Sequence, residues 1–349
     1  MRLSNKILLA GIAFVIVISA SLSAYINKEL NRSIAISGST YFEVKKGATI
    51  GSIAHYLNEL DLLPISTRLF RYYGVVTSGA GSIKAGEYEL VPGMNVKDLL
   101  LLVRSGKVRQ RQITFLEGWT FRQWRDYLRG KSDINQTLEP ETDRGVMKLL
   151  GKPRLHPEGQ FFPDTYHYIK GENDIEILRR AHKKLESVME QQWQSRTIGD
   201  VLQNPYEALI LASIVEKETG YSPDRSRVAR VFLNRLGKNI RLQSDPTVIY
   251  GLGDNFDGNL RRAHLNEPHP YNTYVNEALP PTPICMPGMA AIQATLRAEP
   301  GAFLFFVARG DGSSYFSLNL DEHNRAVNRY QKLPLQKEGP TDGYRSSRP

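Results

Sequence analysis

Residues 208–219 read ALILASIVEKET, an apolar run with helical character that ends in two carboxylates, Glu216 and Glu218. A carboxyl group held against apolar surface keeps its proton to higher pH, as a general acid at a glycosidic oxygen must. In a helix, side chains two positions apart point about 200° away from each other. Only one of the two glutamates can therefore face a given cleft, and periodicity alone does not say which.

Two downstream stretches are dense in polar and aromatic side chains, LQSDPTVIYG at residues 242–251 and PYNTY at residues 270–274. Such groups bind sugar rings through hydrogen bonds and flat apolar contacts. With the acidic run they indicate a carbohydrate-cleaving site, although each side chain alone fits a structural role equally well. The candidates for substrate contact or for support of the acid are Gln243, Asp245, Thr247, Tyr250, Tyr271, Asn272, Tyr274 and Glu216.

The chain has 349 residues, 41% of them hydrophobic and 23% charged, which predicts a globular protein of two or three domains. No charged residue occurs from Ile7 to Ile26, a run long enough to cross a bilayer as one helix. Because two basic residues precede it, the positive-inside rule places residues 1–6 in the cytoplasm and the body of the protein outside. A cleaved signal peptide is the alternative, but the run exceeds the usual apolar core of about 7 to 15 residues. We therefore expect an uncleaved, single-pass anchor at residues 7–26.

The net charge of +9 raises the question of nucleic-acid binding, with a basic run at residues 104–111 as the candidate site. A solvated basic face explains that short run better, and no nucleic-acid-binding motif accompanies it. For an exported domain, lipid headgroups or the acidic peptides of a cell wall are the more fitting anionic partners.

Cys285 is the only cysteine, which excludes an intramolecular disulfide and any metal site built from several cysteines. Its neighbourhood, TPICMPG at residues 282–288, fits a small buried apolar side chain. His264, His269 and His323 lack metal-ligand spacing, and no HExxH motif occurs. We predict that the protein needs neither a metal nor another cofactor.

The exported part has the pattern of two α+β units. In the first, at residues 42–108, an insertion at 63–81 separates the regular elements. In the second, at residues 109–331, Thr120 is predicted to cap a helix. The tail at 332–349 is polar and predicted to be flexible. The expected strands are 42–44, 84–90, 303–307 and 315–318, and the expected helices are 49–60, 96–103 and 174–192.

Taken in order, the motifs make the chain similar to the YceG-like family, the endolytic murein transglycosylases. The resemblance rests on EGW at residues 117–119, EGQFFPDTY at 158–166, the acidic run, and the two polar motifs followed by LPP at 279–281. It covers nearly the whole chain. It implies an N-terminal transmembrane helix, a small LysM-like α/β subdomain that binds N-acetyl sugars or serves as a spacer, and a larger α+β catalytic domain.

The same resemblance implies the chemistry, because the family's catalytic glutamate is the second of the pair and aligns onto Glu218 without a gap. Glu218 would protonate the oxygen that links N-acetylmuramic acid to N-acetylglucosamine within a peptidoglycan strand. As a carboxylate it would then take the proton of the muramic acid C6 hydroxyl, which closes onto C1 to give a 1,6-anhydro end. Further implications are a place in the bacterial inner membrane near peptidoglycan synthases and a role as terminase of glycan elongation.

Two other functions remain open at this point. If Asp245 faced Glu218 and held a water, the enzyme would be a muramidase, whereas the simpler role of Asp245 is to cap a turn or a helix. A non-catalytic wall-binding scaffold would need the anchor and the first unit but no buried acid. Glu158 and Asp164 are weaker catalytic candidates, because their carboxylates fit a role in pinning the backbone of a loop.

Overall fold

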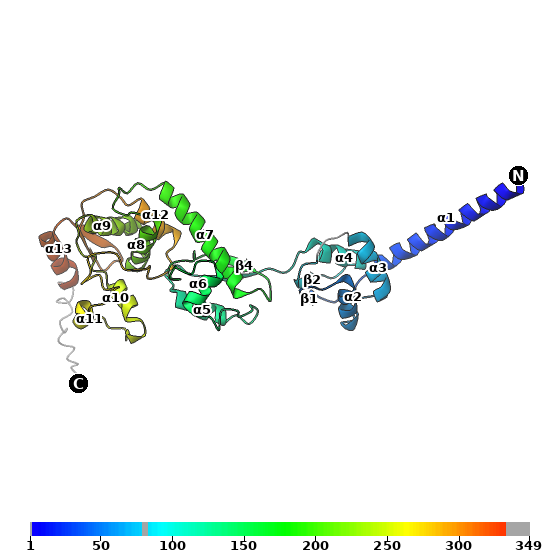
Figure 1. Ribbon diagram of the computed structural model, residues 1–349, viewed down its shortest axis with the longest axis horizontal. Helices are drawn as coiled ribbons and strands as arrows, with labels where there is room; N and C mark the ends of the chain where they lie inside the picture. Colours follow the sequence, from blue (N-terminus) through cyan, green and yellow to red (C-terminus); the bar gives the residue numbers. More distant parts are fainter. Residues whose placement is uncertain (1, 79–82, 333–349) are drawn as a thin grey trace, which may run out of the picture. The chain divides into compact units, whose positions relative to one another are not determined.

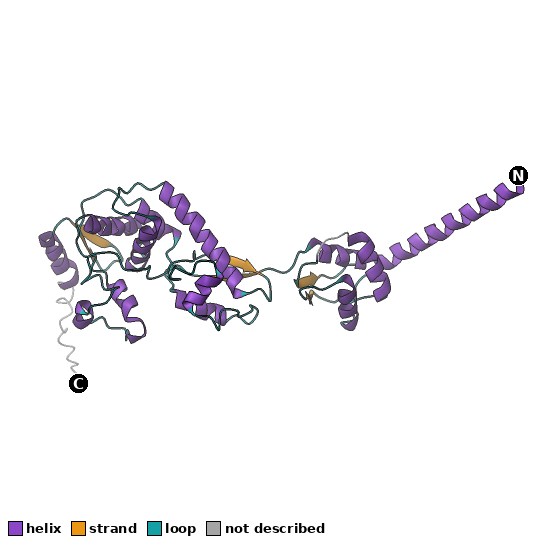
Figure 2. Cartoon of the chain, in the orientation of Figure 1, coloured by secondary structure: helices purple, strands orange, loops and turns teal. Residues whose placement is uncertain are grey.

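The computed structural model describes residues 2–78 and 83–332, which form a mixed α+β fold in which helices outweigh short strands (Figure 2). The chain separates into two compact units. Unit 1 comprises residues 1–112 together with 167–172, and unit 2 comprises residues 113–166 and 173–349. Apart from Lys332, the tail predicted to be flexible lies outside the described residues.

Unit 1 is built on an antiparallel pair, β1 (Thr40–Val44) and β2 (Gly86–Leu90), in which Thr40 lies opposite Leu90. Alternate side chains such as Phe42 and Tyr88 point into the core, as the period of a half-buried strand requires. The helices α2 (Ile50–Glu59), α3 (Thr67–Ser78) and α4 (Val96–Ser105) cover this pair. The expected strands and helices of this unit are confirmed, and the insertion at 63–81 contains a helix, α3, that was not predicted.

The first helix, α1 (Arg2–Leu30), is the one described helix long and apolar enough to cross a membrane, over Lys6–Leu30. Its most apolar stretch is entirely exposed, which is compatible with the predicted anchor. The final turn of α1 differs from the rest of the helix. Leu30 is only 2% exposed and belongs to the hydrophobic core of unit 1.

Unit 2 is organised around α8 (Pro205–Glu218), in which every residue from Ala208 to Val215 is buried. A helix that is apolar on all sides is stable only when other elements surround it. Asn204 caps its first turn through the backbone N–H of Glu207, and Pro205 occupies the first helical position. The helices packed around it are α7 (Asp174–Gln194), α9 (Arg225–Gly237), α10 (Asp245–Leu252) and α12 (Met289–Leu296) (Figure 1).

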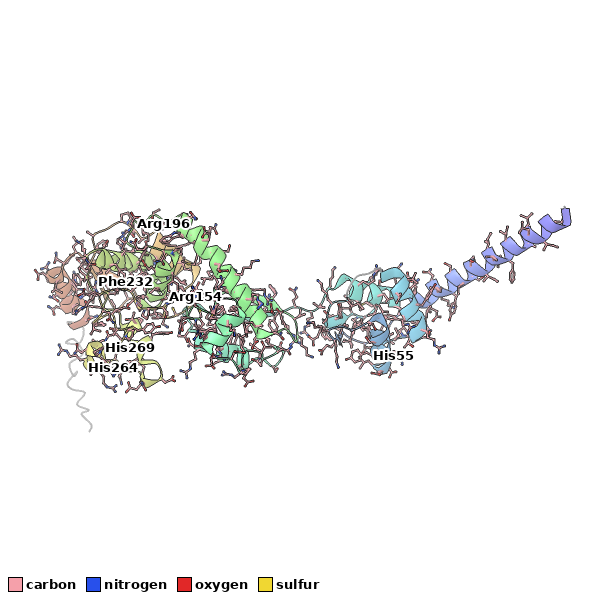
Figure 3. All side chains as sticks on the ribbon, viewed as in Figure 1. His55, Arg154, Arg196, Phe232, His264 and His269 are labelled. Carbon is pink, nitrogen blue, oxygen red and sulfur yellow. The ribbon has the colours of Figure 1, made fainter. Side chains whose placement is uncertain are left out.

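The remaining elements of unit 2 frame this helical core. The antiparallel hairpin of β5 (Phe305–Ala308) and β6 (Ser314–Ser317) confirms the predicted pair of strands, and it packs on α9 and on α13 (Leu320–Val327). Phe232 of α9, labelled in Figure 3, contacts Phe306 edge to face. Two further strands, β3 (Arg111–Thr114) and β4 (Thr165–Tyr168), pair with each other, and each has residues in both units. The other elements of unit 2 are α5 (Phe121–Arg129), α6 (Asp143–Leu149), α11 (Arg262–Asn266), the 3-10 turns Ser222–Asp224 and Gly253–Asn255, and a π turn, Asn328–Lys332.

Thr120 and Cys285 both behave as the sequence predicts. The Thr120 side chain accepts the backbone N–H of Gln123 and caps α5. Cys285 is fully buried, and burial raises the pKa of its thiol well above the ordinary value, so the thiol stays protonated. The hydroxyl of Ser213, at the centre of α8, accepts the backbone N–H of Ile284 and ties this segment to the core helix.

Candidate active site

The C-terminal turn of α8 directs its two carboxylates to different surroundings. Glu218 accepts a hydrogen bond from the Ser244 hydroxyl. Glu216 accepts the backbone N–H of Gly288 at 3.0 Å, and its other oxygen lies 3.8 Å from a guanidinium nitrogen of Arg225. The separation follows from helical geometry, since the two side chains are about 200° apart around the axis. Glu216 is thus engaged by the protein on both oxygens.

Glu218 lies in an open cleft of about 620 Å³. Arg235 of α9 lines the same cleft, and so do three of the candidates predicted from the polar motifs: Gln243, Asp245 and Tyr274. The hairpin β5–β6 and α13 form the rest of the wall, including Phe305 and His323. Residues that are far apart in the sequence therefore meet at one acid.

The surroundings of Glu218 suit its carboxyl group to donate and to accept a proton near neutral pH. Burial raises the pKa of its carboxyl to about 7, and the negative charge of Asp245 acts in the same direction. The hydrogen bond from Ser244 and the positive charge of Arg235 oppose that rise in pKa, because both stabilise the carboxylate. A group whose pKa lies near the working pH is suited to act first as an acid and then as a base.

The two polar motifs are joined to each other by hydrogen bonds through Thr273. The backbone N–H of Gln243 donates to the Thr273 carbonyl, and that of Ser244 donates to the Thr273 hydroxyl, each at 3.0 Å. The hydroxyl of Thr247, which is fully buried, lies 2.8 Å from that of Thr273. Gln243 has a φ of +52°, a left-handed conformation that is uncommon for a residue with a Cβ. This bonded turn holds Ser244 against Glu218.

Tyr274 and Asn272 take different parts in the same loop. The Tyr274 hydroxyl donates to Asp245 at 2.5 Å, so both polar groups stand together in the cleft. Asn272 is 1% exposed, and its amide nitrogen donates to the carbonyls of His264, Leu265 and Glu267. Asn272 thus fixes the loop that carries Tyr274, whose backbone N–H it also accepts.

Tyr250 and Tyr271 belong to a second polar cluster that contains Glu158. The Tyr250 hydroxyl donates to Glu158 at 3.1 Å, and the Tyr271 hydroxyl lies 2.6 Å from that of Thr282. Their rings are in contact, with centroids 4.8 Å apart. Neither tyrosine lines the cleft around Glu218, and both hydroxyls are occupied within the protein. Their contact with a sugar remains a prediction, as does that of Thr247.

Glu158 is a buried carboxyl, 3% exposed, that accepts the backbone N–H of Phe121 and the Tyr250 hydroxyl. Phe121 is the first residue of α5, and Tyr250 is on α10, the helix that begins at Asp245. Glu158 therefore connects the start of α5 to α10. Asp164 lies at the surface, where it pairs with Lys184 and accepts the backbone N–H of Thr165. The weaker candidates therefore have structural contacts, as anticipated for a pinned loop.

We expect Glu158→Gln to remove part of the pH dependence of stability. Burial raises the pKa of Glu158 to about 7, from an ordinary value of 4.5, so its contribution to folding is full below pH 4.5 and is lost as pH rises through 7. A neutral amide does not titrate, and the variant should therefore gain roughly 3 kcal/mol in unfolding free energy relative to wild type between pH 4.5 and 8. Urea unfolding at a series of pH values measures this difference, and two parallel pH curves would contradict the assignment.

Arg235, which lines the cleft, and Ser244, which is buried and donates to Glu218, are two residues whose roles sequence reasoning missed. Arg235 is only 8% exposed, and its guanidinium group donates to the carbonyls of Leu304 and Leu242, each at 2.7 Å. It also lies over the ring of Phe305, 5.1 Å from its centre. Arg235 thus fixes β5 and the turn before α10 while its charge acts on Glu218. Because α9 contains several arginines, nothing in the sequence distinguishes Arg235 as the one that acts on Glu218.

No group of three or more metal-binding side chains occurs within residues 2–78 and 83–332. Figure 3 labels His264 and His269, which lie in the same region of unit 2. The Nδ1 atoms of these two residues accept the backbone N–H groups of Arg261 and Tyr271, respectively. Both rings therefore have a local structural contact.

A sequence model of the YceG-like family matches residues 42–329, which include most of both units and every residue of the cleft as far as α13. The chain belongs to the YceG-like family. The match leaves out α1, so family membership rests on the folded part of the chain. Within the family region stand the acidic run, the two polar motifs and the hairpin that together surround Glu218.

Two proteins similar to this chain are named as endolytic murein transglycosylases. An endolytic murein transglycosylase of Bacillus subtilis (strain 168) is 31% identical across 304 aligned positions, an alignment that covers 82% of this chain and 83% of that protein. The protein of the same name in Streptococcus pneumoniae serotype 2 is 26% identical over 81% of this chain, which spans 57% of that longer relative. The crystal structure of a YceG-like protein of Listeria monocytogenes is 28% identical, with a TM-score of 0.50 over 82% of this chain and 98% of the other.

Proposed function

We propose that this protein is a lytic transglycosylase of peptidoglycan that cleaves glycan strands internally, with Glu218 as its single acid and base. The observation that carries the proposal is a half-buried carboxyl with a pKa of about 7 in an open cleft beside Ser244 and Arg235. The names of the relatives from Bacillus subtilis and Streptococcus pneumoniae support the same activity and substrate.

In the first step, protonated Glu218 gives its proton to the oxygen between N-acetylmuramic acid and N-acetylglucosamine, and the bond from C1 to that oxygen breaks. The carboxylate left behind is stabilised by the Ser244 hydroxyl and by the charge of Arg235. In the second step, the C6 hydroxyl of the same muramic acid attacks C1, and Glu218 takes the hydroxyl proton. Because the nucleophile belongs to the substrate, much of the entropic cost of the attack is already met. The product carries a 1,6-anhydro end, and the enzyme regains its proton.

Asp245 has a supporting role in this mechanism. Its negative charge raises the pKa of Glu218 and so favours the protonated acid. Its hydrogen bond with the Tyr274 hydroxyl fixes both side chains on the wall of the cleft. In glycosidases that use water, a second carboxylate activates the nucleophile. Since Asp245 lines the same cleft as Glu218, a muramidase that uses both carboxylates is the second candidate function.

The structure of the products decides between the two activities. Wild-type protein incubated with purified peptidoglycan should release fragments whose muramic acid ends are lighter by one water, as mass spectrometry reads directly. Reducing ends would establish the muramidase instead and assign Asp245 as the base. No cleavage by the wild type would favour a non-catalytic scaffold that binds the cell wall.

Asp245→Asn should shift the alkaline limb of the activity profile to lower pH while leaving the anhydro ends unchanged. Removal of the negative charge lowers the pKa of Glu218, so less of the acid is protonated above neutrality. The amide keeps an oxygen for the Tyr274 hydroxyl, which limits the change to charge. At pH 8 we expect a loss of roughly three- to tenfold, and a smaller loss at pH 5.5, in initial rates of strand cleavage. A uniform loss of more than a thousandfold at every pH would instead mark Asp245 as a direct participant.

The cellular setting that we propose follows from the N-terminus and from the family. Residues 7–26 anchor the protein in the bacterial inner membrane with residues 1–6 in the cytoplasm and both units outside. Residues 109–331 form the catalytic domain, and residues 42–108 form a LysM-like unit that binds glycan or acts as a spacer. An enzyme held at the membrane reaches strands as they are made, which fits a terminase of glycan elongation that works near peptidoglycan synthases.

A further inference from the structure

One face of α3 is apolar and exposed. Tyr72, Val75 and Val76 are 61%, 62% and 64% exposed, and they stand at helical positions i, i+3 and i+4, which share one side of the helix. Arg68 and Arg71 are exposed in the preceding turn. We call these five residues the α3 stripe. The opposite side of α3 packs into the core of unit 1 through Leu69, Phe70 and Tyr73.

The α3 stripe lies in the unit that receives the end of α1. Leu30 of α1 and Phe70 of α3 are buried in the same hydrophobic core, and α1 contacts α4, which in turn contacts α3. The chain continues from α1 into the unit without a linker, because the N–H of Ile34 donates to Met94 and the N–H of Val96 donates to Arg32. If α1 crosses a bilayer, the surface around its end is held at the level of the lipid headgroups.

We propose that the α3 stripe lies in the headgroup layer of the membrane that α1 crosses, and that anionic phospholipid is its partner. This inference rests on the proposed anchoring of α1. Tyrosine is favoured at membrane interfaces, and short aliphatic side chains there enter the boundary with the acyl chains. Arg68 and Arg71 carry the charge that attracts lipid phosphates. The stripe combines these three features on one face of a helix that shares its hydrophobic core with the last turn of the anchor helix.

A fluorescent probe at position 76 tests this placement in the full-length protein. Cys285 is the only native cysteine and is fully buried, so a thiol introduced by Val76→Cys is the accessible site for an environment-sensitive dye. The protein is reconstituted in vesicles of phosphatidylethanolamine and phosphatidylglycerol, with and without lipids that bear a quencher at the headgroup. The expected result is a blue-shifted emission that the quencher reduces roughly twofold.

Lys46→Cys provides the matched control in the same unit. Lys46 is exposed in the turn before α2 and lines a cleft with Gln110 and His167, and no residue of the α3 stripe lines that cleft. Its dye should show the emission of water and no quenching. Emission at position 76 that matches this control would overturn the proposal, and so would protection from water that the quenching lipid does not affect.

Removal of charge separates lipid recognition from simple burial. With Arg68→Gln and Arg71→Gln added, quenching at position 76 should fall in the anionic vesicles to the lower level expected in phosphatidylcholine vesicles. Equal quenching in both lipids with and without the arginines would contradict a role for anionic lipid. Protein that fails to stay with the vesicles would refute the anchor as well, whereas strand cleavage in detergent tests the proposed activity independently of the stripe.

Discussion

Replacement of Glu218 by glutamine is expected to reduce strand cleavage by roughly a thousandfold or more, because the amide can neither donate the acidic proton nor accept one. The variant should fold normally. Burial holds the pKa of Glu218 near 7, so a neutral side chain already occupies this place for much of the time at neutral pH. The yield of anhydro ends, measured by mass spectrometry, is the readout.

Glu216→Gln is the matched control, two positions away on the same helix. Its carboxylate accepts the Gly288 N–H and faces Arg225, outside the cleft that contains Glu218. We expect a change in stability and less than a tenfold change in rate. A loss at Glu216 equal to that at Glu218, with both proteins folded, would exchange the roles of the two glutamates.

The second large effect is expected at Arg235. Its replacement by glutamine leaves the carbonyls of Leu304 and Leu242 without their charged donor, which should cost roughly 3 to 5 kcal/mol in unfolding free energy. The change also removes the positive charge that opposes the rise in the pKa of Glu218. The alkaline limb of the activity profile should therefore move to higher pH, and the rate should fall roughly a hundredfold, because the carboxylate formed in the first step is less stable.

Arg230→Gln separates these two contributions. Arg230 is on the same helix and donates to the carbonyls of Ala298 and Glu299, each at 2.7 Å, but it does not line the cleft. Its loss should lower the melting temperature and leave the pH profile in place. If Arg235→Gln also left the profile unmoved, its role would be confined to holding the backbone.

Much of the secondary structure could be predicted because it rests on local patterns. The apolar run before Glu216 predicts a buried helix segment, Thr120 fits a cap, and residues 303–307 and 315–318 fit two strands. The helix α3 was missed, since its glycine and its two adjacent valines have low helix propensity. Its buried side becomes visible only when Phe70 is seen among the core residues of unit 1.

The candidate site could be predicted in part for the same reason. Glu218 and the polar motifs stand out as residue types, and three of the predicted motif residues do line its cleft. The contacts that arrange them join distant positions, such as Ser244 to Glu218 and Thr273 to Gln243. No spacing rule connects positions that meet through loop folding. Which polar residues face the cleft and which hold the loop therefore required the structure.

The short segment at residues 167–172 belongs to unit 1 although the chain on both sides of it belongs to unit 2. The backbone consequently passes between the units three times, after residues 112, 166 and 172. A single proteolytic cut after residue 166 would therefore leave residues of both units on each of the two fragments. Removal of residues 42–108 by gene truncation would likewise deprive Lys170 of its ion pair with Glu43. Each unit is therefore built from two separate ranges of the chain, and neither unit can be cut out as one continuous segment.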